Sequence, residues 1–227
     1  ILFDSLKMAF SKEWENIYKN DSGSTWPWSD LISSFYKIIS HLPNNPSVLE
    51  LGFGKGANIP FFLFNSIDYF GVEGSENALK LAIKSFPELK KKLHLIDFTD
   101  GLVDLKTKFN LIFDRASVCH NNKADIENTI IEIYNSLDKD GYFIGIDWFG
   151  DEHAEFLKGT IIDDKMTKFF NKESYFKGYG KVHFVNEDSI YSYFKNNFSF
   201  IHLEKKIKID MATSEQKVFY DFIVKKI

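Results

Sequence analysis

Three alternating glycines that follow a carboxylate form the strongest chemical signal in this sequence. They lie within residues 48–58, where an apolar run containing Glu50 leads into Gly52, Gly54 and Gly56. Glycine adopts positive φ readily and lets the bare backbone approach a ligand, while a helix that begins there offers free N–H groups. The spacing therefore predicts a sharp turn from strand to helix beneath a nucleotide-like ligand.

Two kinds of nucleotide cofactor are compatible with this turn. Gly52-x-Gly54-x-x-Ala57 satisfies the relaxed dinucleotide fingerprint of NAD enzymes. Glu50 favours the other kind, because its carboxylate would repel a pyrophosphate but can accept hydrogen bonds around a cationic amino-acid group. We therefore expect S-adenosylmethionine as the cofactor. An NAD(P)-dependent oxidoreductase and a non-catalytic cofactor-binding regulator are the alternatives.

The Glu-x-Gly-x-Gly-x-Gly pattern at residues 50–56 resembles the first motif of the class I, Rossmann-like S-adenosylmethionine-dependent methyltransferases. The resemblance extends over residues 46–150 and implies methyl transfer, with S-adenosylhomocysteine as product. It also implies that the cofactor lies against this turn and the start of the next helix. The implied contacts are Glu50, Gly52, Phe53, Gly54, Gly56 and Asn58.

A second acidic position follows the next expected strand, at Glu73 and Gly74. A carboxylate there can accept both ribose hydroxyls of the cofactor, a task common to methyltransferases and NAD enzymes. Alternatively, Glu73 only lies near the N-terminus of the following helix, which Ser75 caps. We favour ribose binding.

The third strand is expected to end at Asp97 and Phe98. The resemblance implies that Asp97 accepts a hydrogen bond from the adenine amino group and that Phe98 covers the ring. As an alternative, Asp97 is a turn residue before the loop at residues 99–101.

A polar segment follows the fourth expected strand and contains Asp114, His120 and Asn121. The resemblance places such residues near the transferable methyl group. It implies that Asp114 contacts the cofactor and shares in catalysis. His120 could act as a general base, because an ordinary imidazole pKa near 6.5 lets it accept a proton at cellular pH. Its alternatives are an exposed loop histidine and a member of a polar cluster at the entry to the next helix. Asn121 is expected to contact the acceptor.

Arg115, Asp147 and Trp148 complete the predicted acceptor site. A guanidinium offers a planar fork for an anionic group of the substrate, but Arg115 could instead form a salt bridge to Asp114 or Glu50. Some O-methyltransferases hold Mg²⁺ with an Asp-Asn pair after the fifth strand. Here Trp148 replaces the Asn, which leaves too few oxygen ligands, so we expect no metal.

The elements that must position these residues follow from hydrophobic periodicity. Strands are expected at 47–51, 69–72, 93–96, 109–113 and 142–148, and helices at 6–18, 29–41, 58–64, 75–86, 124–137 and 188–196. Two further strands, 198–209 and 216–224, follow each other without a helix. The sequence thus predicts an α/β, doubly wound, mostly parallel seven-stranded sheet with an antiparallel C-terminal hairpin and helices on both faces.

We expect one methyltransferase domain over residues 1–227. Residues 1–45 would form an N-terminal helical cap, in which Trp26 either closes the cofactor site or only packs the leading helices. Residues 46–150 would form the cofactor-binding core, and residues 149–185 an aromatic insertion that covers the substrate. Residues 186–227 would form the C-terminal helix and hairpin.

Composition narrows the partners and the location. The net charge of −4 and the isoelectric point near 5.9 give no overall basic field, so no nucleic-acid partner is expected. Cys119 is the only cysteine, which excludes an intrachain disulfide and suits a reducing compartment. No apolar run has transmembrane length, and Asp4 and Lys7 do not fit a signal peptide. We expect a cytoplasmic protein without a membrane partner.

A finer resemblance rests on four motifs, at residues 14–18, 26–31, 58–62 and 114–121. They are similar to a subgroup of small bacterial methyltransferases associated with surface-glycan pathways. This implies a small polar acceptor, a sugar or glycan precursor with a hydroxyl or amine group. The acceptor itself, the choice between oxygen and nitrogen, and the oligomeric state are left open by the sequence.

Overall fold

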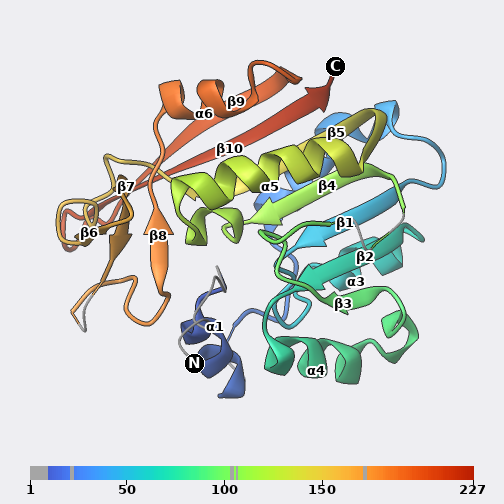
Figure 1. Ribbon diagram of the computed structural model, residues 1–227, viewed down its shortest axis with the longest axis horizontal. Helices are drawn as coiled ribbons and strands as arrows, with labels where there is room; N and C mark the ends of the chain where they lie inside the picture. Colours follow the sequence, from blue (N-terminus) through green and yellow to red (C-terminus); the bar gives the residue numbers. More distant parts are fainter. Residues whose placement is uncertain (1–9, 21–22, 103–104, 106, 171–172) are drawn as a thin grey trace, which may run out of the picture.

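A seven-stranded sheet of order β3-β2-β1-β4-β5-β10-β9 forms the centre of the protein in a computed structural model, which describes residues 10–20, 23–102, 105, 107–170 and 173–227 (Figure 1). Its strands are β1 (Ser47–Leu51), β2 (Asp68–Glu73), β3 (Leu93–Leu95), β4 (Phe109–Arg115), β5 (Leu137–Phe149), β9 (Phe198–Ile209) and β10 (Gln216–Lys226). β1 to β5 run parallel, whereas β10 pairs antiparallel with both β5 and β9. The predicted sheet and hairpin are confirmed.

Helices cover both faces of this sheet, also as predicted. On one face, α5 (Lys123–Ser136) and α6 (Glu187–Phe194) contribute residues such as Ile130 and Phe194 to the larger apolar core. On the other face, α2 (Ser29–Ile38), α3 (Ile59–Phe64) and α4 (Glu76–Ser85) contribute Leu31, Phe62 and Ala82 to a second core. Other helical segments of the described residues are α1 (Lys12–Lys19), η1 (Ile39–His41), η2 (Pro87–Leu89) and η4 (Val118–His120).

The inner strands are apolar runs because parallel strands are buried on both faces. Polar side chains enter these runs mainly where the strands end. Four buried carboxylates lie at the carboxyl ends of β1, β2, β4 and β5, namely Glu50, Glu73, Asp114 and Asp147. Since the ends of parallel strands meet at one edge of the sheet, the fold itself gathers these groups at a single place.

The first helix and the fifth strand differ in extent from the expectation. α1 begins at Lys12, and the start of the predicted helix, residues 6–9, lies outside the described residues. β5 begins at Leu137, where residues 137–141 precede the apolar run and Leu137 pairs with Phe109 across a register shift. Backbone pairing with β4 therefore extends the strand beyond the apolar residues that sequence periodicity detects.

The insertion between β5 and α6 folds into a small antiparallel sheet of order β6-β7-β8. Its strands are β6 (Thr160–Ile162), β7 (Asp164–Phe169) and β8 (Lys181–His183). The aromatic residues of this segment predicted a cover over the substrate but no strands. The strands are short, and β6 and β7 lack a regular alternation of buried and exposed residues, so they carry little periodic signal.

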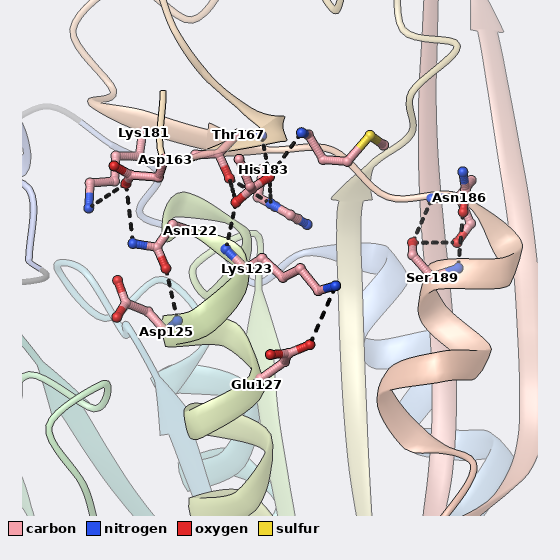
Figure 2. A network of polar contacts seen from close by, with 12 residues as sticks. Asn122, Lys123, Asp125, Glu127, Asp163, Thr167, Lys181, His183, Asn186 and Ser189 are labelled. Atoms are coloured by element: carbon pink, nitrogen blue, oxygen red, sulfur yellow. Dashed lines mark hydrogen bonds and ion pairs between the residues drawn. The ribbon is translucent and has the colours of Figure 1, made fainter. Parts of the chain in front are cut away.

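Polar contacts fix the small sheet to the start of α5 (Figure 2). Asn122 caps this helix by accepting a hydrogen bond from the Asp125 backbone N–H at 2.9 Å, while its Nδ2 donates to Asp163 at 3.2 Å. Lys181 of β8 forms an ion pair with Asp163 at 3.4 Å. The backbone N–H of Lys123 donates to Asp164 at 3.0 Å. The insertion is thereby held beside the segment that follows β4.

Among the helices that the structure describes, none has the length and apolar character needed to cross a membrane.

Candidate active site

The glycine turn has the geometry that its sequence predicts. Gly52 and Gly54 adopt φ values of +71° and +57°, which side chains of L-residues rarely allow. A Cβ atom at Gly52 would lie 2.5 Å from Cβ of Ser117, and one at Gly54 would lie 2.5 Å from the hydroxyl oxygen of Tyr18. Both the backbone conformation and the close packing above the turn therefore require glycine.

Two adjoining cavities open at the carboxyl edge of the sheet, with volumes of about 490 Å³ and about 100 Å³. The smaller cavity reaches Glu73, Gly74, Asp97, Phe98 and Asn121. The larger one reaches Glu50, Phe53, Gly54, Asn58, Asp147 and the β9–β10 hairpin. Both are lined by Trp14, Tyr18, Gly52, Arg115, Ala116 and His120. The sequence-predicted cofactor and acceptor residues are thus largely brought to one place.

Glu73 fastens the glycine turn to the end of β2. Its Oε2 accepts a hydrogen bond from the Gly54 backbone N–H at 2.8 Å, and its Oε1 accepts one from the Ser75 N–H at 2.9 Å. Burial raises the pKa of Glu73 to about 7, although these hydrogen bonds act to lower it. A carboxylate has about four acceptor positions, so capacity remains for ligand hydroxyls. Ser75 caps the N-terminus of α4, as expected, because its hydroxyl accepts a hydrogen bond from the Ala78 N–H.

Glu50 organises the other side of the turn. Its carboxylate accepts hydrogen bonds from Nδ2 of Asn58 at 2.7 Å and from the hydroxyl of Tyr69. Asn58 in turn accepts a hydrogen bond from the Trp28 backbone N–H at 3.3 Å. Burial raises the pKa of Glu50 to about 7. Glu50 therefore lines the larger cavity and also positions a second predicted cofactor residue, Asn58.

Asp97 serves as a turn residue and as a lining residue of the smaller cavity. One carboxylate oxygen accepts hydrogen bonds from the backbone N–H and hydroxyl of Thr99, at 3.1 and 2.7 Å. The other accepts one from the Phe10 N–H at 2.8 Å. Phe98 lies beside it in the cavity wall. The two interpretations of Asp97 made from the sequence are therefore compatible with each other.

Asp114 and Trp148 lie beneath the cavities and line neither of them. Both side chains are completely buried, and the indole Nε1 of Trp148 donates to Asp114 at 2.9 Å. The other Asp114 oxygen accepts from the backbone N–H groups of Ser117 and Val118 at 2.9 and 3.0 Å. The structure thus corrects the expected ligand contacts of this pair: Asp114 shapes the turn that carries His120, and Trp148 holds Asp114.

A neighbouring tryptophan takes the place predicted for Trp26. The side chain of Trp26 is 76% exposed and lines neither cavity, whereas Trp28 lines the larger one. The guanidinium carbon of Arg115 lies 3.7 Å from the centre of a Trp28 ring, a cation–π contact. Within the Trp-Pro-Trp loop, the residue that closes the site is therefore Trp28.

His120 is a buried histidine with a fixed tautomer, so the alternative of an exposed loop histidine is wrong. Its Nδ1 lies 2.8 Å from the carbonyl oxygen of Lys181 in β8. A carbonyl can only accept, so Nδ1 carries the proton and Nε2 has a free lone pair. Burial lowers the pKa of His120 to about 4. The side chain is therefore neutral at pH 7 and able to accept a proton.

Arg115 forms its salt bridge with Asp147, at 2.6 Å, and not with Asp114 or Glu50 as the sequence suggested. Its Nε is buried and has no hydrogen-bond partner among the described residues. The guanidinium is thereby oriented between Asp147 and Trp28, with one donor left unused at the site.

Asp147 also belongs to a cluster of three carboxylates. The other two are those of Asp30 and Asp221, and oxygens of all three lie within 4.8 Å of one another. The ammonium of Lys206 lies 2.6 to 2.7 Å from an oxygen of each. Burial alone would lower the pKa of Lys206, but its hydrogen bonds to these carboxylates raise it well above the ordinary value. Lys206 therefore supplies a positive charge that these carboxylates share, and the cluster ties α2 to the hairpin.

Several lining residues were not singled out by the sequence analysis. They are Trp14 and Tyr18 of α1, Lys208, Lys217 and Phe219 of the hairpin, and Phe149. Only Trp14 and Tyr18 belonged to a recognised motif. For the hairpin residues, the signal is present but weak: they lie on one face of two alternating strands, and the strand register is needed to bring them together.

Comparison with known proteins agrees with this site. Residues 49–145, from within β1 to within β5, match the model of a methyltransferase domain. No curated protein sequence matches the chain. Among solved structures, a SAM-dependent methyltransferase from Methanosarcina mazei is similar with a TM-score of 0.69 and 14% identity, covering 84% of this chain and 97% of the other.

Two further structures are similar. A SAM-dependent methyltransferase from Anabaena variabilis has a TM-score of 0.68 and 14% identity, covering 96% of this chain and 94% of the other. A 1,6-didemethyltoxoflavin-N1-methyltransferase from Burkholderia thailandensis, with bound S-adenosylhomocysteine, has a TM-score of 0.59 and 13% identity, covering 87% and 78%. At such identities these likenesses concern the fold.

Residues 49–145 match a methyltransferase domain, and the sheet with its antiparallel hairpin has the fold of S-adenosylmethionine-dependent methyltransferases. S-adenosylmethionine is the cofactor that the sequence predicts for this domain. The match to a methyltransferase domain disagrees with the alternative of an NAD(P)-dependent oxidoreductase. The alternative of a non-catalytic cofactor-binding regulator is separated from an enzyme by turnover.

Proposed function

We propose that the enzyme transfers the methyl group to an oxygen or nitrogen of a small polar acceptor that binds in the larger cavity. One observation carries the proposal: His120, with its unprotonated Nε2, lines both cavities and so lies where a cofactor and an acceptor would meet. Glu73 and Asp97 would hold the ribose and adenine, and Glu50 with the glycine turn would hold the amino-acid part.

The cofactor, when bound, supplies an electrophilic methyl group on a sulfonium. His120 would accept the proton that the acceptor loses, and the Lys181 carbonyl would keep its ring in the required orientation. Because its pKa is about 4, His120 is a weak base, so alignment of the acceptor should provide a large part of the rate. Asn121, which lines the smaller cavity and donates to the Val118 carbonyl at 3.1 Å, would help to place it.

Aromatic side chains around His120 would exclude water from the reaction. The ring centres of Trp14, Phe149 and Tyr179 lie 4.8, 5.6 and 5.9 Å from that of His120. Tyr175 and Tyr179 come from the insertion, which supports its assignment as a substrate cover. A sugar or glycan precursor is the acceptor class that the sequence motifs imply, and aromatic walls suit the face of a sugar ring. A bacterial, cytoplasmic setting stays a prediction.

Calorimetric titration with S-adenosylhomocysteine, S-adenosylmethionine and NADH tests the cofactor part of this proposal. We expect binding of both sulfur nucleotides and none of NADH. The acceptor part is tested by incubating the enzyme with methyl-labelled cofactor and a bacterial metabolite extract, followed by mass spectrometry. A labelled small molecule that depends on the enzyme is expected. Binding of the cofactor without any labelled product would contradict the proposed activity.

A further inference from the structure

Two lysines stand directly opposite each other at the hairpin end of the larger cavity. Lys208 of β9 pairs with Lys217 of β10, and directly opposed residues of an antiparallel pair project from the same face. Both side chains line the larger cavity. Like charges in this arrangement repel each other and destabilise the pair. The hairpin therefore carries a local cost that a negatively charged group between the lysines would remove.

Among the described residues, no carboxylate forms an ion pair with Lys208 or Lys217. Instead, Lys208 Nζ lies 5.4 Å from the Phe219 ring centre, and Lys217 Nζ lies 4.4 Å from that of Tyr175. The charge of Lys208 does act on Asp30, whose pKa is lowered by its hydrogen bond with Lys206 and also by Lys208. The contrast with Lys206 is large, because that residue, on the same face of β9, touches three carboxylates.

Other charges of the cavity wall do not offset these lysines. Asp147 is engaged by Arg115 and Lys206, and Glu50 accepts hydrogen bonds from Asn58 and from a tyrosine. Arg115 adds a buried Nε–H that has no partner among the described residues. The cavity thus offers an unused donor and two cations that form no ion pair among the described residues.

The rest of this end of the cavity is aromatic, formed by Phe149, Tyr175, Tyr179 and Phe219. Phe149 and Phe219 are buried, whereas Tyr175 is 52% exposed, so this end of the cavity is open to solvent on one side. The aromatic rings provide flat surfaces for the body of a ligand.

We propose that the methyl acceptor is an anion at neutral pH, whose carboxylate or phosphate group binds between Lys208 and Lys217. Its body lies along the aromatic wall, and its reacting oxygen or nitrogen points toward His120. This inference rests on the proposed function and names its substrate class. Lys208 and Lys217 are then the residues that determine specificity for charge.

The test uses two probes of the same shape, 2-naphthoate and its neutral amide, titrated into the enzyme loaded with S-adenosylhomocysteine. The variant Lys208→Gln/Lys217→Gln removes the paired charges. The matched control, Lys139→Gln/Lys195→Gln, removes the same charge at exposed positions that line neither cavity. We expect the wild-type enzyme to bind the carboxylate at least about tenfold more tightly than the amide. This preference should disappear in the cavity variant and persist in the control.

The outcomes separate this inference from the proposed function. If S-adenosylhomocysteine does not bind the wild-type enzyme, the proposed function itself fails. If it binds, but the two probes bind equally or not at all, the anionic acceptor is refuted. A tenfold loss of S-adenosylhomocysteine affinity in the Lys208→Gln/Lys217→Gln variant would also refute it, because the lysines would then serve the cofactor carboxylate.

Discussion

At the scale of single residues, the site depends on buried polar groups that hold one another in place. Glu73 holds the glycine turn, Asp114 holds the turn that carries His120, and the Lys181 carbonyl fixes the imidazole tautomer. Buried groups of this kind tolerate little change, because an unpaired donor or acceptor costs roughly 1–3 kcal/mol.

The first prediction concerns Gly54 and uses Gly178 as its matched control. Both residues have positive φ, +57° and +79°, so alanine strains the backbone at either position. Only at Gly54 would the new Cβ collide with another residue, Tyr18, whereas nothing lies within 4 Å at Gly178. Gly54→Ala should therefore lose S-adenosylhomocysteine binding in calorimetry, and Gly178→Ala should keep it. Equal binding by the two variants would show that close packing above the turn is unimportant.

The second prediction concerns His120. His120→Ala should lower turnover on the identified acceptor by roughly 10²–10⁴-fold, with cofactor affinity almost unchanged, because the group acts on the acceptor's proton. His41→Ala, at an exposed histidine, is the control. Since burial lowers the pKa of His120 to about 4, protonation should not reduce the wild-type rate between pH 8 and pH 5. Glu50 and Glu73 also titrate near neutral pH, so the His120→Ala profile is compared with that of the wild type. A decline near pH 6.5 that is present in the wild type and absent in His120→Ala would mean that His120 titrates as an exposed histidine.

At the scale of elements, the N-terminal helix α1 forms part of the wall of both cavities. The arrowheads of β1 to β4 point toward the side where α1 and the small β6–β8 sheet lie (Figure 1). α1 is anchored on α4 through Glu15, whose carboxylate accepts from the Ser75 hydroxyl at 2.5 Å and from the Asn77 N–H at 3.2 Å. Trp14 and Tyr18 reach both cavities from this helix.

Removal of this anchor gives the third prediction. Glu15→Ala should release α1 and weaken S-adenosylhomocysteine binding by about tenfold, the equivalent of one or two hydrogen bonds to a charged group. Asn16→Ala, at an exposed position of the same helix, should bind like the wild-type enzyme in the same titration. Unchanged affinity of Glu15→Ala would mean that α1 covers the site without support from α4.

At the scale of the whole molecule, buried titratable groups connect the site with stability. Burial raises the pKa values of Glu50 and Glu73 to about 7, and it lowers those of His120, His153 and His183 to about 4. The carboxyl groups and the histidines change the pH dependence of stability in opposite directions. The carboxyl groups make the folded state bind extra protons as the pH falls, whereas the neutral histidines make the unfolded state bind more.

The fourth prediction isolates one carboxyl group. In the folded protein Glu50 has a pKa of about 7, above its ordinary value of 4.5, so its contribution is most favourable below pH 4.5 and is lost as the pH rises to 7. Glu50→Gln removes this loss, and an amide can still accept from Asn58 and donate to Tyr69. Relative to wild type, the variant should gain on the order of 2–3 kcal/mol of unfolding free energy between pH 4.5 and pH 8.

Urea unfolding at several pH values, without added cofactor, measures this difference. Glu88→Gln, at an exposed position, is the control and should show no such trend. A constant difference between Glu50→Gln and wild type across the pH range would contradict the raised pKa of Glu50.

The sequence by itself determined the sheet, its hairpin and the glycine turn, and it named many of the residues that line the two cavities. These features depend on local chemistry: apolar runs become buried strands, and Gly52 and Gly54 are required by positive φ wherever the rest of the chain lies. Capping residues such as Ser75 mark a helix start in the same local way. Because the strands are parallel, their order along the chain was enough to place Glu50 and Glu73 at one edge.

Only the tertiary structure decided which of two neighbouring side chains faces the site. Asp114 and Trp148 point into the core while Arg115 and Asp147 point to the cavity, and Trp28 replaces Trp26. At a strand end or in a loop, a rotation of one residue reverses the direction of a side chain, and periodicity does not record it. The pairing of Lys208 with Lys217 likewise depends on the register of two strands, which long-range packing sets.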